Sequence, residues 1–159
     1  IKNVYAEIPM DKPDAGYNYE GPIEDLPRNI SPASIVGLPE YKIRNVTLQN
    51  IEIVSPGGGN SYYAYRGLTP AELDSIPEMA TSYPEFSQFK ELPAWGFYIR
   101  HAEGIIFDNV TFRALKKDYR PAIVTDDAEG VTFKNVRFME PESEGKGQIF
   151  PYKSKITKK

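Results

Sequence analysis

The side chains best suited to chemistry lie in the second half of the chain. Asp126-Asp127 is a pair of adjacent carboxylates, the groups that perform general acid and base catalysis or bind calcium. Arg100-His101 joins a guanidinium, which pairs with carboxylates, to the sole histidine of the sequence. Because Asp126-Asp127 stands one repeat after Arg100-His101, we interpret it as a pair at a turn. We expect His101 to lie in a loop or at the surface, and we assign no catalytic residue.

The composition limits both fold and function. Fourteen prolines and 12 glycines in 159 residues are too many for a helix bundle and favour a turn-rich β protein. A net charge of -3 without a basic stripe before the tail argues against a nucleic-acid binder. No apolar run is long enough to span a bilayer. Since the chain has no cysteine, disulfides, thiolate zinc sites and cysteine nucleophiles are excluded. We assign no cofactor and no metal.

An internal repeat must position these side chains. Residues 45–53, 104–112 and 130–138 align without gaps, and each holds two alternating apolar pairs separated by a polar slip in the alternation. One straight strand cannot turn both pairs inward, because side chains alternate along a strand, whereas two short strands joined at a corner can. Asparagine tolerates left-handed backbone at such a corner. We therefore expect stacked corners to form an asparagine ladder of Asn50, Asn109 and Asn135.

Short strands that meet at fixed corners and recur every ~20–30 residues are typical of a parallel β-helix. The sequence therefore predicts an all-β chain of about three such coils, without the leucine spacing of a leucine-rich repeat. We expect one partial domain over residues 1–159. Its repeats cover about 34–54, 96–114 and 122–139, its insertions 9–33 and 55–95, and its tail 140–159.

The segments outside the repeat carry their own signals. Thr69, Pro70 and Glu72 predict the start of a short helix over residues 69–76. The spacing of Tyr62, Tyr63 and Tyr65 indicates an extended segment. The tail carries four lysines over 153–159, and we expect it to be a frayed, solvated end.

The first residues resemble the middle of a coil. Lys2-Asn3-Val4 is similar to the corner at Asn109-Val110. Because an uncovered terminal coil exposes its core and its strand edges, we expect further N-terminal coils or a self-associating subunit to cover the Ile1 end.

Several segments in and around the long insertion resemble the C-terminal part of bacterial glycoside hydrolase family 28 proteins, the polygalacturonase-like enzymes of gut Bacteroidetes. These segments are Pro56-Gly-Gly-Gly59, Tyr83-Pro-Glu-Phe86, Leu92-Pro-Ala-Trp-Gly-Phe-Tyr98, Arg100-His101 and Asp118-Tyr-Arg-Pro-Ala-Ile-Val124. The resemblance implies a right-handed parallel β-helix and a periplasmic or extracellular, pectin-active glycosidase. That family places its catalytic carboxylates in an Asn-Thr-Asp motif and an Asp-Asp pair, accompanied by Gly-His-Gly and Arg-x-Lys. The Asn-Thr-Asp, Gly-His-Gly and Arg-x-Lys motifs do not occur here, and Asp126-Asp127 follows Thr125 where the family pair follows Gly, so we do not equate it with the family pair.

The resemblance therefore implies a C-terminal β-helix portion that lacks the catalytic carboxylates and is inactive alone. Aromatic rings stack on sugars and arginine pairs with the carboxylate of galacturonate, so residues in or after the insertion are candidates to bind a pectic polysaccharide. The alternative for them is loop packing. The candidate substrate-binding residues are Tyr83, Glu85, Tyr98, Arg100 and His101.

Two other functions remain open from the sequence. The first is a non-catalytic carbohydrate-binding or structural β-helix protein that functions as it stands. The second is a calcium-dependent, pectate-lyase-like β-helix, for which Asp126-Asp127 is the one hint.

Overall fold

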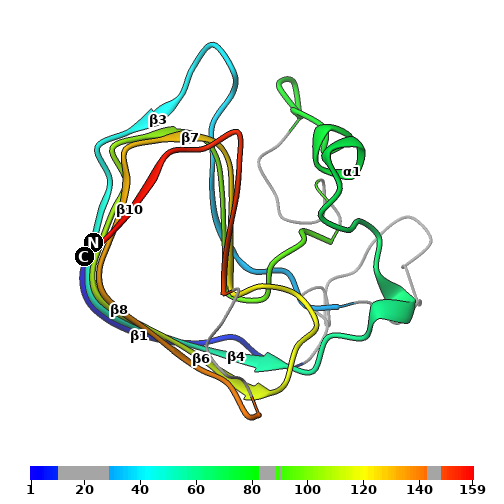
Figure 1. Cartoon of the computed structure of the whole chain (residues 1–159), viewed down its shortest axis with the longest axis vertical. Helices are drawn as coiled ribbons and strands as arrows, with labels where there is room; N and C mark the ends of the chain where they lie inside the picture. Colours follow the sequence, from blue (N-terminus) through cyan, green and yellow to red (C-terminus); the bar gives the residue numbers. More distant parts are fainter. Residues whose placement is uncertain (11–28, 83–88, 90, 143–147) are drawn as a thin grey trace.

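The chain is all-β with parallel sheets, as the repeat predicts. The computed structural model describes residues 1–10, 29–82, 89, 91–142 and 148–159. Figure 1 shows the strands superposed in a stack, with the one α-helix of the described residues to one side. The elements are β1 (Lys2–Glu7), β2 (Ala33–Val36), β3 (Ile43–Arg44), β4 (Thr47–Gly57), η1 (Ser61–Tyr63), α1 (Pro70–Asp74), β5 (Phe97–Glu103), β6 (Ile106–Lys116), β7 (Ile123–Glu129), β8 (Val131–Met139), β9 (Ile149–Tyr152) and β10 (Ile156–Lys158).

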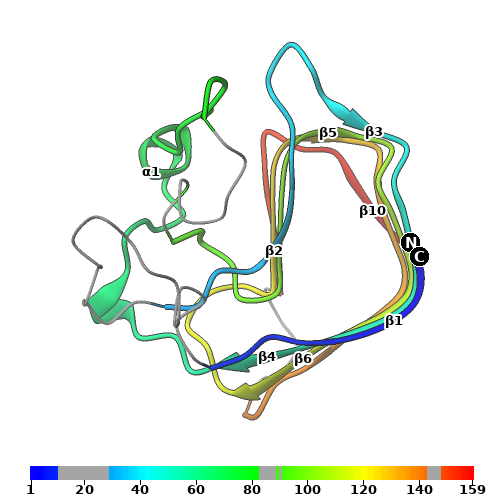
Figure 2. The ribbon, with the colours of Figure 1, turned by 180° about the vertical axis from the view of Figure 1, so that it is seen from behind.

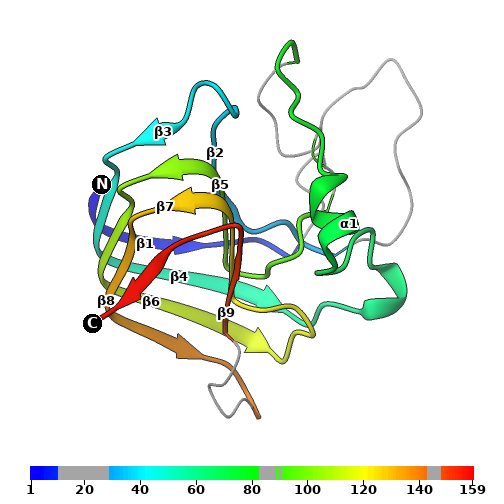
Figure 3. The same cartoon turned by 45° about the horizontal axis from the view of Figure 1, so that its top comes forward.

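The strands form two sheets. One has the order β1-β4-β6-β8-β10, and the other has the order β2-β5-β7-β9 with β3 also paired to β5. All of these pairs are parallel, and Figure 3 shows them side by side. From β4 onward the chain passes alternately from one sheet to the other. Repeats therefore stack in register, so that Phe107 lies beside Phe133 and Arg100 beside Asp126.

The predicted asparagine ladder is confirmed, and it extends one residue further than expected. Asn50 donates from Nδ2 to Oδ1 of Asn3 at 3.1 Å, Asn109 donates to Asn50 at 2.9 Å, and Asn135 donates to Asn109 at 2.9 Å. All four have positive φ, between 50° and 55°. The residue at each corner thus turns the backbone and also bonds to the corner of the neighbouring repeat.

Replacing a central ladder residue should separate these two roles. We expect Asn109→Ala to lower the free energy of unfolding by about 2 kcal/mol, because alanine is strained at positive φ and both ladder bonds are lost. Asn109→Gly loses the same bonds without that strain, so it should recover about 1 kcal/mol of the loss. Urea denaturation of the three proteins measures both effects. Equal losses in the two variants would contradict the role of the backbone conformation.

The core lies between the two sheets and follows the predicted alternation. Ile105, Phe107, Val110 and Phe112 are all buried, on both sides of the corner at Asn109. Equivalent rings stack from repeat to repeat, with centroids 5.1 Å apart for Phe107 and Phe133. The slip in the apolar pattern therefore marks a corner, as expected.

Two expectations outside the core are wrong. The tail is not a frayed end, because β9 pairs with β7 and β10 pairs with β8 in the manner of a further repeat. Residues 61–63 are not extended but form the 3₁₀-helix η1. The helix predicted at 69–76 is confirmed as α1, and Thr69 and Glu72 form its capping box. No helix of the described residues is long and apolar enough to cross a membrane.

Candidate functional site

The long insertion covers the outer face of the sheet formed by β5, β7 and β9. Figure 2 shows α1 and its flanking segments on that side, away from the core between the sheets. A second apolar cluster joins the insertion to the sheet through Leu73, Ile76, Leu92, Ala94, Tyr98 and Val124. The sheet is therefore buried on both faces, which explains why β5 is buried from Phe97 to Ala102.

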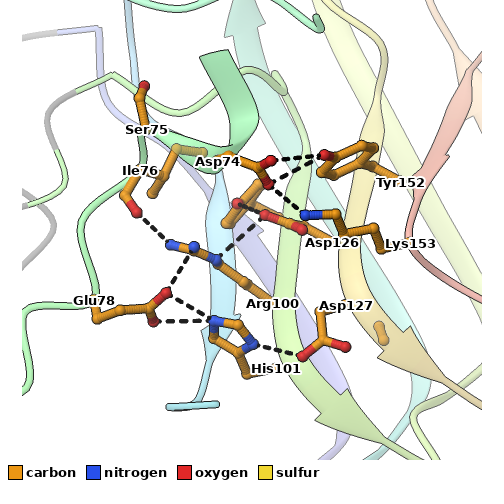
Figure 4. Close-up of polar contacts among 12 residues, drawn as sticks. Asp74, Ser75, Ile76, Glu78, Arg100, His101, Asp126, Asp127, Tyr152 and Lys153 are labelled. Atoms are coloured by element: carbon orange, nitrogen blue, oxygen red, sulfur yellow. Dashed lines mark hydrogen bonds and ion pairs between the residues drawn. The ribbon is translucent and has the colours of Figure 1, made fainter. Parts of the chain in front are cut away.

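The stacking of repeats brings five polar residues together beneath this insertion, and Figure 4 shows their contacts. Arg100 and His101 come from β5 and the acidic pair from β7, where Arg100 is in register with Asp126. The fifth residue comes from the segment that follows α1. We call this group the Arg100–His101 cluster: Glu78, Arg100, His101, Asp126 and Asp127.

Arg100 ties the sheet to the insertion. Its Nη1 donates to the carbonyl oxygen of Ile76 at 2.7 Å, and its Nη2 donates to Oε1 of Glu78 at 2.8 Å. Its Nε lies 3.2 Å from Oδ2 of Asp126. That contact is an ion pair without an aligned hydrogen bond, because the Nε proton has no acceptor in line among the described residues. The guanidinium is thus held entirely by protein groups.

His101 lies between two carboxylates. Its Nδ1 is 2.7 Å from Oδ2 of Asp127, and its Nε2 is 2.9 Å from Oε2 of Glu78. The hydrogen bonds are those to Oδ2 of Asp127 and to Oε1 of Glu78, which lies 3.2 Å from Nε2, and the ring donates both only when the imidazole is protonated. The expectation of a surface or loop histidine is wrong, because His101 belongs to β5 and is buried.

The two adjacent aspartates have opposite environments. Burial raises the pKa of Asp126, although Arg100 and the hydroxyl of Tyr98, which donates to it at 3.0 Å, act in the other direction. Burial also opposes ionisation of Asp127, but hydrogen bonds from His101 and Lys42 outweigh it and hold the pKa of Asp127 below its ordinary value. A pair of carboxyl groups with diverging pKa values has the electrostatics of an acid and a base. Asp126 is almost fully buried, however, so no ligand reaches it in this structure.

The acidic pair also fulfils its predicted place in the repeat. Asp127 has a positive φ of 45°, like His101 at 48° and Lys153 at 45°, so these three residues occupy successive copies of one corner. Asp127 thus stands at a corner of the repeat, as interpreted from the sequence, while both aspartates belong to strand β7.

The last repeat contributes a second attachment of α1, which the sequence did not indicate. Asp74 at the end of α1 accepts hydrogen bonds from the hydroxyl of Tyr152 at 3.1 Å and from Nζ of Lys153 at 2.6 Å. These bonds hold the pKa of the exposed Asp74 carboxyl below its ordinary value, with the bond from Lys153 as the largest cause. Figure 4 shows this contact beside the Arg100–His101 cluster.

A buried network at the base of the insertion was also missed. Asp118 accepts hydrogen bonds from Nε of Arg120 at 3.0 Å, from Nη2 of Arg120 at 3.0 Å and from the backbone of Gly59 at 2.9 Å. Glu91 accepts from the hydroxyl of Tyr119 and from Nδ2 of Asn29, both at 2.9 Å. Asp118 and Arg120 are two residues apart, but the contacts that bury them with Gly59, Asn29 and Glu91 join residues distant in the sequence and leave no local pattern.

Three of the five predicted substrate-binding residues lie in the part of the chain that the structure describes. Tyr83 and Glu85 lie outside the described residues. Tyr98, Arg100 and His101 are brought together, but the ring of Tyr98 is completely buried and the polar atoms of the other two contact protein groups. In this structure they anchor the insertion, and their contact with a substrate stays a prediction.

Within the described residues, no group of three or more histidine, aspartate or glutamate side chains is arranged to hold a metal ion. The calcium-dependent hypothesis therefore gains no support from this part of the chain. Comparison of the chain with protein-family models, with curated proteins and with solved structures finds no match.

Proposed function

We propose that this chain is the C-terminal β-helix portion of a pectin-active, polygalacturonase-like glycoside hydrolase, without the catalytic carboxylates and inactive by itself. The fold assigned in this proposal is a right-handed parallel β-helix. It is supported by the all-parallel pairing, by the passage of the chain between two sheets and by the asparagine ladder. Crossover connections between parallel strands are right-handed in nearly all proteins.

One observation carries the proposal. Three of the described segments that resemble family 28, residues 56–59, 92–98 and 118–124, are spread along the sequence yet meet at the base of the insertion. Gly59 donates its backbone N–H to Asp118 at 2.9 Å, and Trp95 donates to the carbonyl oxygen of Pro121 at 3.1 Å. Arg120 reaches back to the carbonyl oxygen of Leu92 at 3.4 Å. Segments that together carry the resemblance to one family are thus also neighbours in space here.

The proposal predicts the outcome of an activity assay. Purified chain incubated with galacturonate oligosaccharides should bind them but release no reducing ends above the uncatalysed level, because the paired carboxylates that cleave glycosidic bonds are absent. Chromatography of the products measures turnover, and titration calorimetry measures binding. Robust turnover would contradict the absence of the catalytic groups, and failure to bind any pectic oligosaccharide would contradict the substrate class.

A second candidate function is a non-catalytic carbohydrate-binding or structural β-helix that functions as it stands. The burial of Tyr98, Arg100 and His101 beneath the insertion favours it, since these side chains stabilise the structure instead of lining an open cleft. It predicts a monodisperse particle whose glycan affinity needs no additional chain. Sedimentation of the purified protein distinguishes the two candidates, because a β-helix portion with an uncovered terminal coil should self-associate, whereas both candidates predict glycan binding.

A further inference from the structure

A shallow groove lies on the outer face of the other sheet, across β1, β4, β6 and β8, which Figure 3 shows side by side. It has a volume of about 540 Å³. One wall is the asparagine ladder at Asn3, Asn50 and Asn109. The other wall is a row of four side chains that the strand register aligns: Tyr5, Glu52, Thr111 and Arg137.

Both walls repeat at the spacing of parallel strands, about 4.8 Å, so the row of four side chains extends over roughly 14 Å. Asn50 and Asn109 each donate one amide N–H to the neighbouring asparagine and retain a second N–H, whereas Asn3 accepts from Asn50 and retains both of its amide N–H groups. Thr111 contributes a hydroxyl to the opposite wall. The groove therefore offers regularly spaced groups that both donate and accept hydrogen bonds.

Among the residues that line the groove, the charge left uncompensated is positive, and the carboxylate of Glu7 lies outside this lining beside Tyr5. Glu52 is neutralised by Arg113, which contacts its Oε1 from Nε at 3.0 Å and from Nη2 at 2.9 Å. Arg137 is exposed and makes no ion pair within the described part of the chain. At the other end of the row, the ring of Tyr5 is 62% exposed and its hydroxyl donates to Glu7. The groove thus combines one guanidinium that forms no ion pair with the described residues and one exposed aromatic ring.

We propose that this groove binds an acidic oligosaccharide laid across the strands. Its carboxylate or sulfate pairs with Arg137, a sugar ring packs on Tyr5, and its hydroxyl groups bond to the ladder amides. Sugar hydroxyl groups both donate and accept hydrogen bonds, so they can pair with the asparagine amides. The sugar units of an oligosaccharide recur at regular intervals, as do the strands that carry these amides. A nucleic acid is disfavoured because a phosphate backbone requires several cations along its track. The site lies on a different sheet from the Arg100–His101 cluster and requires no catalysis, so it does not depend on the proposed hydrolase origin.

Calorimetric titration of the full chain tests this site. The ligands are a galacturonate trisaccharide, a sulfated oligosaccharide and a neutral oligosaccharide of equal length, with a single-stranded oligonucleotide for comparison. We expect binding of an acidic oligosaccharide, and the first two ligands reveal whether carboxylate or sulfate is preferred. Arg137→Gln should weaken it about tenfold, as for the loss of one charged hydrogen-bonding pair. Tyr5→Ala should weaken it several-fold.

Arg44→Gln is the matched control, because Arg44 is an exposed arginine on β3 of the other sheet, and it should leave the affinity unchanged. Unchanged melting temperatures would show that the exposed substitutions preserve the fold. Four results would each overturn the proposal that the groove binds an acidic oligosaccharide. They are equal affinity in Arg137→Gln and the parent, equal affinity for the neutral ligand, tighter binding of the oligonucleotide, and no binding at all. Turnover by the chain would overturn the proposed function and leave the groove intact.

Discussion

Replacing Phe112 by alanine is expected to lower the free energy of unfolding by about 3–5 kcal/mol, the usual cost of removing a large buried ring. Phe112 is completely buried. Its ring centroid lies 5.8 Å from that of Phe138 in a stacked arrangement and 6.1 Å from that of Phe107. It also meets Phe97 edge-on at 6.2 Å. Because these rings come from both sheets and from successive repeats, the cavity cannot close by moving one strand.

Urea denaturation followed by circular dichroism measures this effect. Leu115→Ala is the control, since Leu115 lies on the same strand but is exposed, and it should cost less than about 0.5 kcal/mol. A loss below about 1 kcal/mol for Phe112→Ala would mean that the Phe112 ring lies outside a shared core.

The position of Phe112 in the core was predictable from the sequence, and the reason is local. The two alternating apolar pairs and the asparagine between them recur at a fixed spacing, and each copy contains the whole signal for one corner. The same holds for α1, whose capping box involves only Thr69 and Glu72. Features encoded within a few residues, or repeated at one period, can thus be recognised in the amino-acid sequence alone.

The last repeat could not be recognised in this way. β9 contains Pro151, and Lys158 stands beside Phe133, where an apolar residue would complete the pattern. A proline that cannot donate to the ladder is tolerated at the edge of a sheet, and a lysine there keeps its ammonium in water. The last repeat is more polar than the preceding ones, and this polarity removes the periodic signal.

The candidate site was predictable in part, and its limit is the sequence distance between contacts. Arg100 and His101 were identified, and their neighbours Asp126 and Asp127 follow from the repeat. Glu78 contacts both Arg100 and His101 at 2.8–2.9 Å, but it lies in the insertion, which has no counterpart in the other repeats. The sequence could not reveal that Arg100 and His101 are buried instead of open to a substrate. Their burial depends on how the insertion folds over the outer face of the sheet.

The buried pair of Asp118 and Arg120 gives the second large expected effect. Asp118→Asn should destabilise the protein by about 3–5 kcal/mol, because Arg120 then remains buried without its principal counter-charge. The side chain of Asp118 is fully buried and that of Arg120 nearly so. Glu91 lies 3.8 Å from Arg120 and cannot replace the two bonds from Nε and Nη2. An exposed pair provides the control: Glu52→Gln, which breaks the contact with Arg113, should cost less than about 1 kcal/mol.

The same pair should contribute to the acid sensitivity of the fold. Burial by itself would raise the pKa of Asp118, but the hydrogen bonds from Arg120 and Gly59 outweigh it and hold that pKa below its ordinary value. The pKa of an aspartate in the unfolded chain is about 3.9. Between that value and the lower pKa of the folded state, Asp118 is therefore mostly protonated in the unfolded chain and mostly ionised in the folded chain. The stabilisation is complete above that value and disappears as the pH falls through the lower pKa of the folded state. Between about pH 5 and pH 2, the parent protein should lose more stability than Asp118→Asn. Parallel acid dependences in urea denaturation would show instead that Asp118 does not respond to pH in this range.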